Sequence, residues 1–251
     1  MKHVLMTQSR MDSSLESKIK SHVDLEVCHV PFIKFIQNQI DTSELRKHVD
    51  ALIFTSINGV KYSRHLLNEI SYEYVIAIGH KTSEYCKSKH IHVDYISEDS
   101  TQEGIVELVR LINQDKMVIK SVLLPTSNRS RDVIEQCLNT QQITVQKIEV
   151  YDTVDNKQAY IKLEQFLSTN QSFTKYLMLS SPSAANHFVT LIYQLDKKYQ
   201  DYIEQLTIVV IGAITYEAIM SELAKYDIQV KQVVISAQPT FESMVDRIVS
   251  E

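Results

Sequence analysis

The chain has 251 residues, of which 44% are hydrophobic and 23% are charged, and its net charge is −5. These values are ordinary for a folded globular protein, and the acidic balance argues against the basic surface of a nucleic-acid-binding protein. The apolar runs are far shorter than the roughly 20 residues of a membrane span, so we expect neither a nucleic acid nor a membrane as partner.

The cysteines and histidines show no spacing typical of a metal site. Cys28, Cys86 and Cys137 form no CxxC pair, and the histidines, His90 and His92 included, form no HxxxH cluster. Small, buried, reduced thiols explain three unpaired cysteines better than metal or redox chemistry does. We therefore expect a cytoplasmic protein without a bound metal.

Short β-type runs alternate with helical patterns along the whole chain, which predicts an α/β fold with parallel sheets. The first strand is expected at Val4–Met6, and a helix follows over 11–23 with Leu15, Ile19 and Val23 on one face. The next segment is expected to be extended, because a proline at position 31 is incompatible with a helix interior.

The middle of the chain repeats the strand–helix alternation. Ser100 and Glu103 have the spacing of a capping box, which predicts a helix that begins there. We expect strands at 51–55, 75–78 and 121–125, each followed by a helix, and a second extended segment at 145–154. The last third of the chain has further strands at 176–180, 208–211 and 231–235, again with helices between them.

Three pieces of the middle stretch recur, in the same order, in the last third. Thr55-Ser56 ends an apolar run as Ser180-Ser181 does, Gly79–Thr82 matches Gly212–Thr215, and the run from Thr101 resembles the run from Thr240. A repeat of this kind predicts two domains of similar plan. We expect a ligand-sized space between them.

The repeated hydroxyl and glycine residues stand where predicted strands end and helices begin. In an open parallel sheet, ligands bind at this edge, and helix N-termini there favour anions. Each serine or threonine taken singly is better explained as a helix cap than as a ligand contact, and each glycine as a turn residue. However, three of the chain's four glycines, Gly59, Gly79 and Gly212, lie at repeated strand ends.

Few residues outside the repeat indicate chemistry. The chain has no GxGxxG, no phosphate-binding GxxxxGK[ST] and no GxSxG motif, which argues against a dehydrogenase, an NTPase and a serine hydrolase. Arg129 and Arg131 follow a strand and either bind an anion or are solvated. Tyr151, in the second extended segment, is either a packed aromatic or a hydrogen-bond donor.

The combined pattern resembles the uroporphyrinogen-III synthase family, almost from end to end. The residues that carry the resemblance are Ile53-Phe-Thr-Ser-Ile-Asn-Gly-Val60, Ile78-Gly-His-Lys-Thr82, Val122-Leu-Leu-Pro125 with Arg131-Asp132, Val150-Tyr-Asp-Thr-Val154, Leu179-Ser-Ser-Pro-Ser-Ala184, Ile211-Gly-Ala-Ile-Thr215 and Pro239-Thr240. Each piece is short, and their common order makes the resemblance specific.

The resemblance implies two Rossmann- or flavodoxin-like domains joined by a two-stranded antiparallel ladder. Domain 1 would comprise residues 1–30 plus 156–251, domain 2 residues 44–145, and the ladder residues 31–43 and 146–155. The resemblance also implies a monomer without a cofactor that cyclises hydroxymethylbilane to uroporphyrinogen III. Water is lost, an azafulvenium cation and a spiro intermediate form, and ring D is inverted.

The resemblance assigns one catalytic residue, Tyr151, which would assist departure of the substrate's hydroxyl group. The expected substrate-binding residues are Thr55, Ser56, Asn58, Gly79, Thr82, Ser181, Ser183, Gly212 and Thr215. The sequence departs from the family pattern at Gly59, where alanine is commoner, and at His80 and Ile214. A non-catalytic two-domain receptor for a small polyanion is the alternative that uses the same residues.

Overall fold

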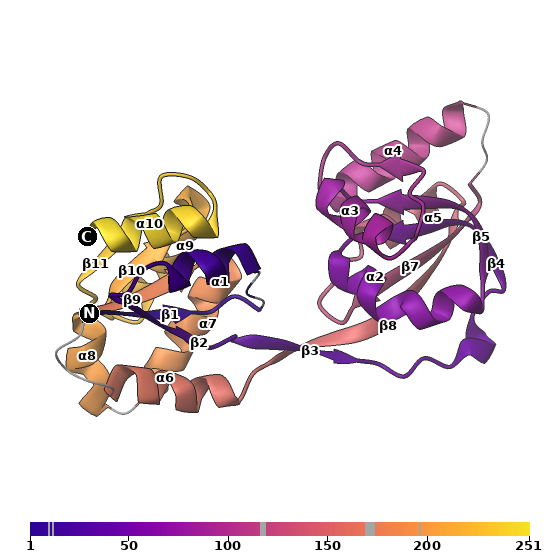
Figure 1. Ribbon diagram of the computed structural model, residues 1–251. Helices are drawn as coiled ribbons and strands as arrows, with labels where there is room; N and C mark the ends of the chain where they lie inside the picture. Colours follow the sequence, from indigo (N-terminus) through magenta and orange to yellow (C-terminus); the bar gives the residue numbers. More distant parts are fainter. Residues whose placement is uncertain (10, 12, 116–118, 169–173, 196) are drawn as a thin grey trace. The chain divides into compact units, whose positions relative to one another are not determined.

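The computed structural model describes residues 1–9, 11, 13–115, 119–168, 174–195 and 197–251. Its chain forms two compact units (Figure 1). Unit 1 comprises Met1–Lys34 and Asp155–Glu251, and unit 2 is Phe35–Val154. None of the helices in the described part of the chain has the length and apolar character that a membrane span requires.

Unit 1 is built on a five-stranded sheet in the order β11-β10-β9-β1-β2, and every pairing within it is parallel. The strands are β1 (Lys2–Met6), β2 (Leu25–His29), β9 (Thr174–Leu179), β10 (Thr207–Val210) and β11 (Gln232–Ile235). The helices are α1 (Ser13–Lys20), α6 (Gln158–Ser168), α7 (Pro182–Tyr193), α8 (Gln200–Glu204), α9 (Ala213–Lys225) and α10 (Phe241–Ser250). A short 3₁₀ turn, Lys197–Tyr199, precedes α8.

Both faces of this sheet are covered by helices, because the strands are apolar on both sides. Leu5 and Leu177 pack with residues of α6, α7 and α9, whereas Val4 and Met178 pack with α1 and α10 on the other face. Successive side chains of a strand point to opposite faces. Strands without a polar face are typical of a doubly wound parallel sheet.

Unit 2 has a six-stranded sheet in the order β3-β8-β7-β4-β5-β6. The strands are β3 (Ile33–Gln37), β4 (His48–Phe54), β5 (Ser71–Ala77), β6 (Tyr95–Ile96), β7 (Ser121–Ser127) and β8 (Thr144–Asp155). The helices are α2 (Ile57–Ser63), α3 (His80–Ser88), α4 (Gln102–Gln114) and α5 (Val133–Thr140), with 3₁₀ turns at Thr42–Glu44 and Arg64–Asn68. Phe54 packs on the α2 and α3 side, and Ile53 packs on the α4 and α5 side.

The two extended segments pair with each other in opposite directions. The N–H of Asn38 donates to the carbonyl of Val150 at 3.0 Å, and the N–H of Asn156 donates to the carbonyl of Phe32 at 2.8 Å. Strands β3 and β8 are neighbours in the sheet, so the expected antiparallel ladder is present. The predicted domain limits of 1–30 plus 156–251 and 44–145 stay a prediction.

Two local expectations were wrong. Helix α1 ends at Lys20, and Val23, expected on its buried face, has 94% of its surface exposed. Helix α4 is capped by Thr101, whose hydroxyl accepts from the N–H of Gly104 at 3.0 Å, instead of by Ser100. Thr101 matches Thr240, which caps α10 in the same way: the hydroxyl of Thr240 accepts from the N–H of Ser243 at 3.1 Å. The repeat was therefore a better guide to the cap than the capping-box spacing.

Candidate functional site

Each sheet has one place where successive connections leave in opposite directions. In unit 1 this place lies between β9 and β1, since β9 leads through α7 to β10 and β1 leads through α1 to β2. In unit 2 it lies between β4 and β7, which lead to β5 and to β8. This place is called the topological switch point of the sheet. Open α/β sheets bind ligands there, beyond the carboxyl ends of the strands.

The serines predicted at these two points cap helices with almost the same geometry. Ser56 (φ −165°, ψ 158°) begins α2, and its hydroxyl accepts from the N–H of Gly59 at 2.9 Å. Ser181 (φ −162°, ψ 157°) begins α7, and its hydroxyl accepts from the N–H of Ala184 at 3.2 Å. The cap explanation of these residues is confirmed. Anion binding at the two helix ends stays a prediction, and the caps are compatible with it because a capped helix N-terminus keeps other free N–H groups.

The paired glycines also begin helices in the same way. Gly79 (φ 172°, ψ 175°) precedes α3, and Gly212 (φ 179°, ψ 177°) precedes α9. The threonines three residues later lie in the first turns and are buried, with Thr82 exposed by 5% and Thr215 by 3%. Thr82 and Thr215 therefore stand at equivalent places in the two units.

The surroundings of the glycines differ. A Cβ atom at position 79 would lie 2.5 Å from the hydroxyl oxygen of Ser100, whereas one at position 212 would meet no heavy atom within 4 Å. A Cβ atom at position 59 would lie 3.0 Å from the carbonyl oxygen of Pro125. An alanine at position 59 would therefore require the Pro125 carbonyl of β7 to move by a few tenths of an ångström.

Tyr151, the expected catalytic residue, lies in β8 within the core of unit 2 and has 7% of its surface exposed. Its ring stacks on Tyr62, with centroids 5.1 Å apart, and meets the edge of Phe35 at 5.7 Å. In the β7–β8 pairing Tyr151 lies opposite Ser127, just after a shift in register. These contacts fix the direction in which the phenol points.

The loop after β7 carries the two arginines that the sequence left open. Arg131 makes a double hydrogen bond with the carboxylate of Glu103, at 2.9 and 3.2 Å. This interaction holds the pKa of the exposed Glu103 carboxyl below its ordinary value. Arg131 is thus engaged in an ion pair, and Arg129 is an exposed neighbour in the same loop.

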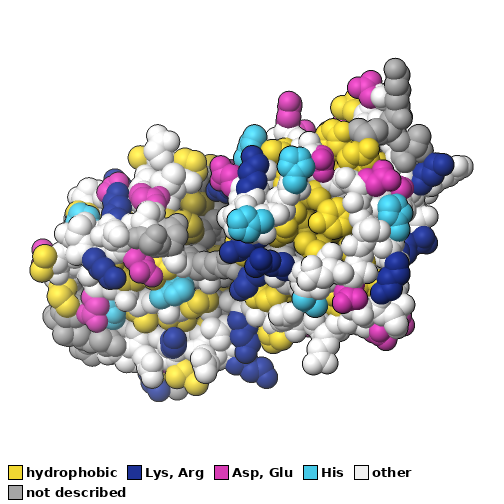
Figure 2. All heavy atoms as spheres, turned by 45° about the vertical axis from the view of Figure 1, so that its right-hand side comes forward, with side chains coloured by type: hydrophobic (Ala, Val, Ile, Leu, Met, Phe, Trp, Pro, Cys, Tyr) yellow, Lys and Arg dark blue, Asp and Glu magenta, His cyan; other side chains and the backbone are white. Residues whose placement is uncertain are grey.

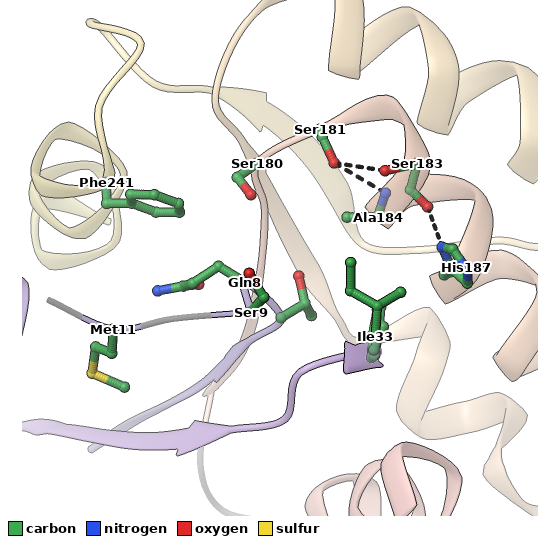
Figure 3. A pocket seen from close by; sticks show the side chains of 12 residues that line it. Gln8, Ser9, Met11, Ile33, Ser180, Ser181, Ser183, Ala184, His187 and Phe241 are labelled. Atoms are coloured by element: carbon green, nitrogen blue, oxygen red, sulfur yellow. Dashed lines mark hydrogen bonds between the residues drawn. The ribbon is translucent and has the colours of Figure 1, made fainter. Parts of the chain in front are cut away.

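A cavity of about 510 Å³ opens at the switch point of unit 1 (Figure 3). Its lining includes two of the predicted substrate-binding residues, Ser181 and Ser183, whose hydroxyl oxygens lie 3.1 Å apart. The other lining residues are Thr7, Gln8, Ser9, Met11, Phe32, Ile33, Ser180, Ala184, His187 and Phe241. Gly212 and Thr215 are not among them, and the remaining predicted residues, Thr55, Ser56, Asn58, Gly79 and Thr82, belong to unit 2.

His187 lies beside the predicted serines. Its Nδ1 lies 2.7 Å from the carbonyl oxygen of Ser183, and its Nε2 lies 3.1 Å from a carboxylate oxygen of Asp155. Both partners are acceptors, so whichever ring nitrogen carries a proton can donate to its partner. His187 follows Ser183 by one helical turn on α7, a spacing from which the sequence could have indicated it.

Gln8 and Ser9 were missed for a different reason. They follow the first strand, which has no counterpart in the three repeated pieces. Thr7-Gln8-Ser9 does, however, resemble Thr126-Ser127-Asn128 at the end of β7. A search for hydroxyl and amide residues after every predicted strand would have found them.

The face of the molecule seen in Figure 2 carries charges of both signs. Figure 2 shows lysine and arginine side chains together with acidic and histidine side chains on the visible face of each unit. With a net charge of −5, attraction of an anion must come from local groups such as helix N-termini. The fold is that of a two-unit α/β protein with capped helix ends at the switch point of each sheet, and its sequence lacks the fingerprint of a nucleotide-binding enzyme.

A sequence profile described as uroporphyrinogen-III synthase HemD matches residues 13–246. This chain therefore belongs to the uroporphyrinogen-III synthase family, whose members are cyclising lyases of tetrapyrrole biosynthesis. The resemblance found in the sequence is thereby confirmed, and the receptor alternative is not favoured. No curated protein sequence matches the chain.

Solved structures agree with this assignment of the fold. The chain is similar to uroporphyrinogen-III synthetase from Helicobacter pylori, with 17% identity, a TM-score of 0.62 and coverage of 100% of this chain and 99% of that one. A mutant uroporphyrinogen III synthase from Thermus thermophilus matches with 14% identity, a TM-score of 0.52 and coverage of 100% and 98%. The expected α/β fold with two parallel-sheet domains is confirmed.

Proposed function

We propose that this chain cyclises hydroxymethylbilane to uroporphyrinogen III, with the residues named below in the roles given. The observation that carries the proposal is the family match over 13–246. The capped helix ends at the switch point of each sheet support it, because acetate and propionate groups are anions that such ends bind.

The reaction makes modest demands on side-chain chemistry. The C–O bond of the hydroxymethyl group breaks, the oxygen leaves as water with an added proton, and the azafulvenium cation remains. Ring D attacks this cation through its substituted carbon, and a spiro intermediate forms. The older bond from that carbon to the bridge toward ring C then breaks, which leaves a second cation on that bridge. The unsubstituted α-carbon of ring D attacks this second cation and loses its proton, so that the ring recloses in inverted orientation. Since the cation is stabilised by the pyrrole, folding the chain of rings correctly matters more than strong acid–base groups.

Tyr151 is the residue that we assign to departure of the hydroxyl group. Its phenol would donate a hydrogen bond to the leaving oxygen, and its packing against Tyr62 and Phe35 would hold it in place. Thr55, Ser56, Asn58, Gly79 and Thr82 of unit 2 would hold substrate carboxylates. Ser181, Ser183, Gly212 and Thr215 of unit 1 would do the same.

We further propose a cytoplasmic monomer that needs no cofactor. The three unpaired cysteines support the reducing compartment. We also propose that the ladder of residues 31–43 and 146–155 separates the functional domains 1–30 plus 156–251 and 44–145.

A coupled assay tests the function. Hydroxymethylbilane is supplied, and the isomers of the porphyrin are separated after oxidation. We expect isomer III, formed much faster than the spontaneous isomer I. Isomer I alone, at the rate seen without protein, would refute the enzymatic function.

The same assay tests Tyr151. We expect Tyr151→Phe to lower kcat at least severalfold and up to about a hundredfold, because a positioned proton donor is lost. Tyr74→Phe is the matched control, since Tyr74 is a half-buried tyrosine of the same unit that packs against Tyr95. An unchanged kcat for Tyr151→Phe would remove Tyr151 from the mechanism.

A further inference from the structure

Gln8 is a buried polar side chain whose hydrogen-bonding groups have no partner. The residue has 9% of its surface exposed. Among the described residues, neither its side-chain oxygen nor its side-chain nitrogen makes a hydrogen bond. A buried amide in this state destabilises a protein, so such a group calls for an explanation.

The place of Gln8 supplies the explanation. It follows β1 at the switch point of unit 1 and lines the 510 Å³ cavity. The other residues with buried, unpartnered side-chain atoms in the described chain are His3, Ser83, Gln102 and Thr207. None of them lines this cavity. In Figure 3 the Gln8 side chain extends toward the side of the cavity where Met11 and Phe241 lie.

The opposite side of the cavity is suited to an anion. Pro182 has no N–H, Ala184 donates to Ser181, and Ala185 donates to the carbonyl of Ser181, which leaves the N–H of Ser183 in the first turn of α7. The hydroxyl groups of Ser181 and Ser183 and the ring of His187 stand on the same side (Figure 3). A carboxylate there would also meet the positive end of the helix.

The cavity therefore joins three kinds of surface. Gln8 offers one acceptor and two donors, the start of α7 offers donors, and Met11, Phe32, Ile33 and Phe241 offer apolar area. A pyrrole ring that carries carboxylate side chains matches all three, because its N–H can donate to the Gln8 oxygen. A first carboxylate can accept from the Gln8 nitrogen, and a second can reach α7.

We propose that this cavity binds one pyrrole ring of the substrate, with Gln8 as the residue that recognises the ring N–H and a neighbouring carboxylate. This inference rests on the proposed function. It adds Gln8, Met11, His187 and Phe241 to the binding residues, and it places a ring subsite wholly within unit 1.

Binding is tested with a stable monopyrrole that bears one acetate and one propionate side chain. The full-length protein is labelled with ¹⁵N, and the side-chain amide signal of Gln8 is assigned by its absence in Gln8→Leu. We expect this signal to shift saturably as the monopyrrole is added. A signal that does not move while the pyrrole is in large excess would mean that the cavity holds solvent only, and would overturn the proposal.

Gln8→Leu separates a ligand-binding role from a structural one. Leucine fills similar space without polar atoms, so the thermal midpoint should stay the same or rise, while monopyrrole affinity falls about tenfold or more. Thr207→Val is the matched control, because Thr207 is exposed by 1%, has an unpartnered hydroxyl and lies at the opposite end of the same sheet. This control should leave affinity unchanged. A Gln8→Leu protein that is less stable but binds normally would show a structural role.

Activity distinguishes this inference from the proposed function. If the wild type forms isomer III and Gln8→Leu raises the KM for hydroxymethylbilane about tenfold with little change in kcat, both the proposed function and the pyrrole subsite are supported. If the wild type forms isomer III and Gln8→Leu has an unchanged KM, the subsite is wrong and the function stands. If the wild type forms isomer I alone but the monopyrrole still shifts the Gln8 signal, the function fails and the cavity remains a pyrrole site.

Discussion

The two units share their backbone at the switch point but differ in the side chains placed there. Ser56 and Ser181 cap their helices at dihedral angles that agree within a few degrees. At the end of the neighbouring strand, however, the hydroxyl of Ser127 in unit 2 accepts from the N–H of Arg129 at 3.3 Å, whereas the corresponding Gln8 of unit 1 has unpartnered amide atoms. The two units thus share the backbone frame at the switch point, whereas the polar side chains at its edge differ.

The largest expected effect tests whether each unit has a core of its own. Phe188 and Phe54 are fully buried, in unit 1 and unit 2 respectively. Replacing either by alanine should lower the free energy of unfolding of its unit by about 3–5 kcal/mol, because a cavity is left. Hydrogen exchange should lose protection only in the unit that carries the change. Equal loss in both units would contradict separate cores.

The twin caps should behave as a matched pair. We expect Ser56→Ala and Ser181→Ala each to lower the free energy of unfolding by about 1 kcal/mol, since each leaves one helix N–H without its acceptor. Denaturant titration of the two variants provides the measurement. Costs that differ by more than about twofold would show that the similar dihedral angles do not reflect similar energetics.

The twin glycines should separate stability from binding. Gly212→Ala should leave the free energy of unfolding unchanged, or raise it by about 0.4–1 kcal/mol, because the backbone is extended and no atom lies near the new methyl group. Its KM for hydroxymethylbilane should rise if substrate approaches the backbone there. Gly79→Ala is the comparison variant, and it should be less stable than Gly212→Ala because the Ser100 hydroxyl must rotate. An unchanged KM for Gly212→Ala would remove Gly212 from the substrate contacts.

The smallest effect concerns pH and unit 2 alone. Burial by itself would raise the pKa of Asp50, but hydrogen bonds from the Lys120 N–H, at 2.7 Å, and from Ser121 outweigh it and lower the pKa below its ordinary 3.8. A carboxyl with a lowered pKa in the folded state stabilises the protein above its ordinary pKa and loses this contribution as the pH falls through the lowered value. Unit 2 should therefore lose stability below about pH 4.

Asp50→Asn is the variant that tests this origin. Its side-chain oxygen can still accept, but it no longer titrates, so acid unfolding of unit 2 should begin at lower pH than in the wild type. Unit 1, followed by hydrogen exchange in the same samples, serves as the internal control. An identical acid profile for unit 2 in both proteins would show that other carboxyls dominate.

The sequence was informative wherever backbone geometry repeats. Ser56, Ser181, Gly79 and Gly212 could be placed at helix starts because a cap and an extended glycine depend on neighbouring residues only. The cavity was not foreseen, since it forms from strands that pair over a long sequence separation, as β1 and β9 do. The burial of Tyr151 against Tyr62 and Phe35 likewise depends on tertiary packing, which residue type alone does not report.

Unit 1 is built from two stretches of chain that are separated by the whole of unit 2, and this has a consequence for synthesis on the ribosome. Strand β1 pairs on one side with β9, for example Lys2 with Thr174 and Met6 with Met178, so its partner emerges only after the whole of unit 2 has been made. Chains fold as they are translated, at about 5–20 residues per second, and unit 2 can be complete while β1 and β2 still lack β9. The nascent chain therefore carries exposed apolar strands for many seconds, and this is the interval in which chaperones would protect it.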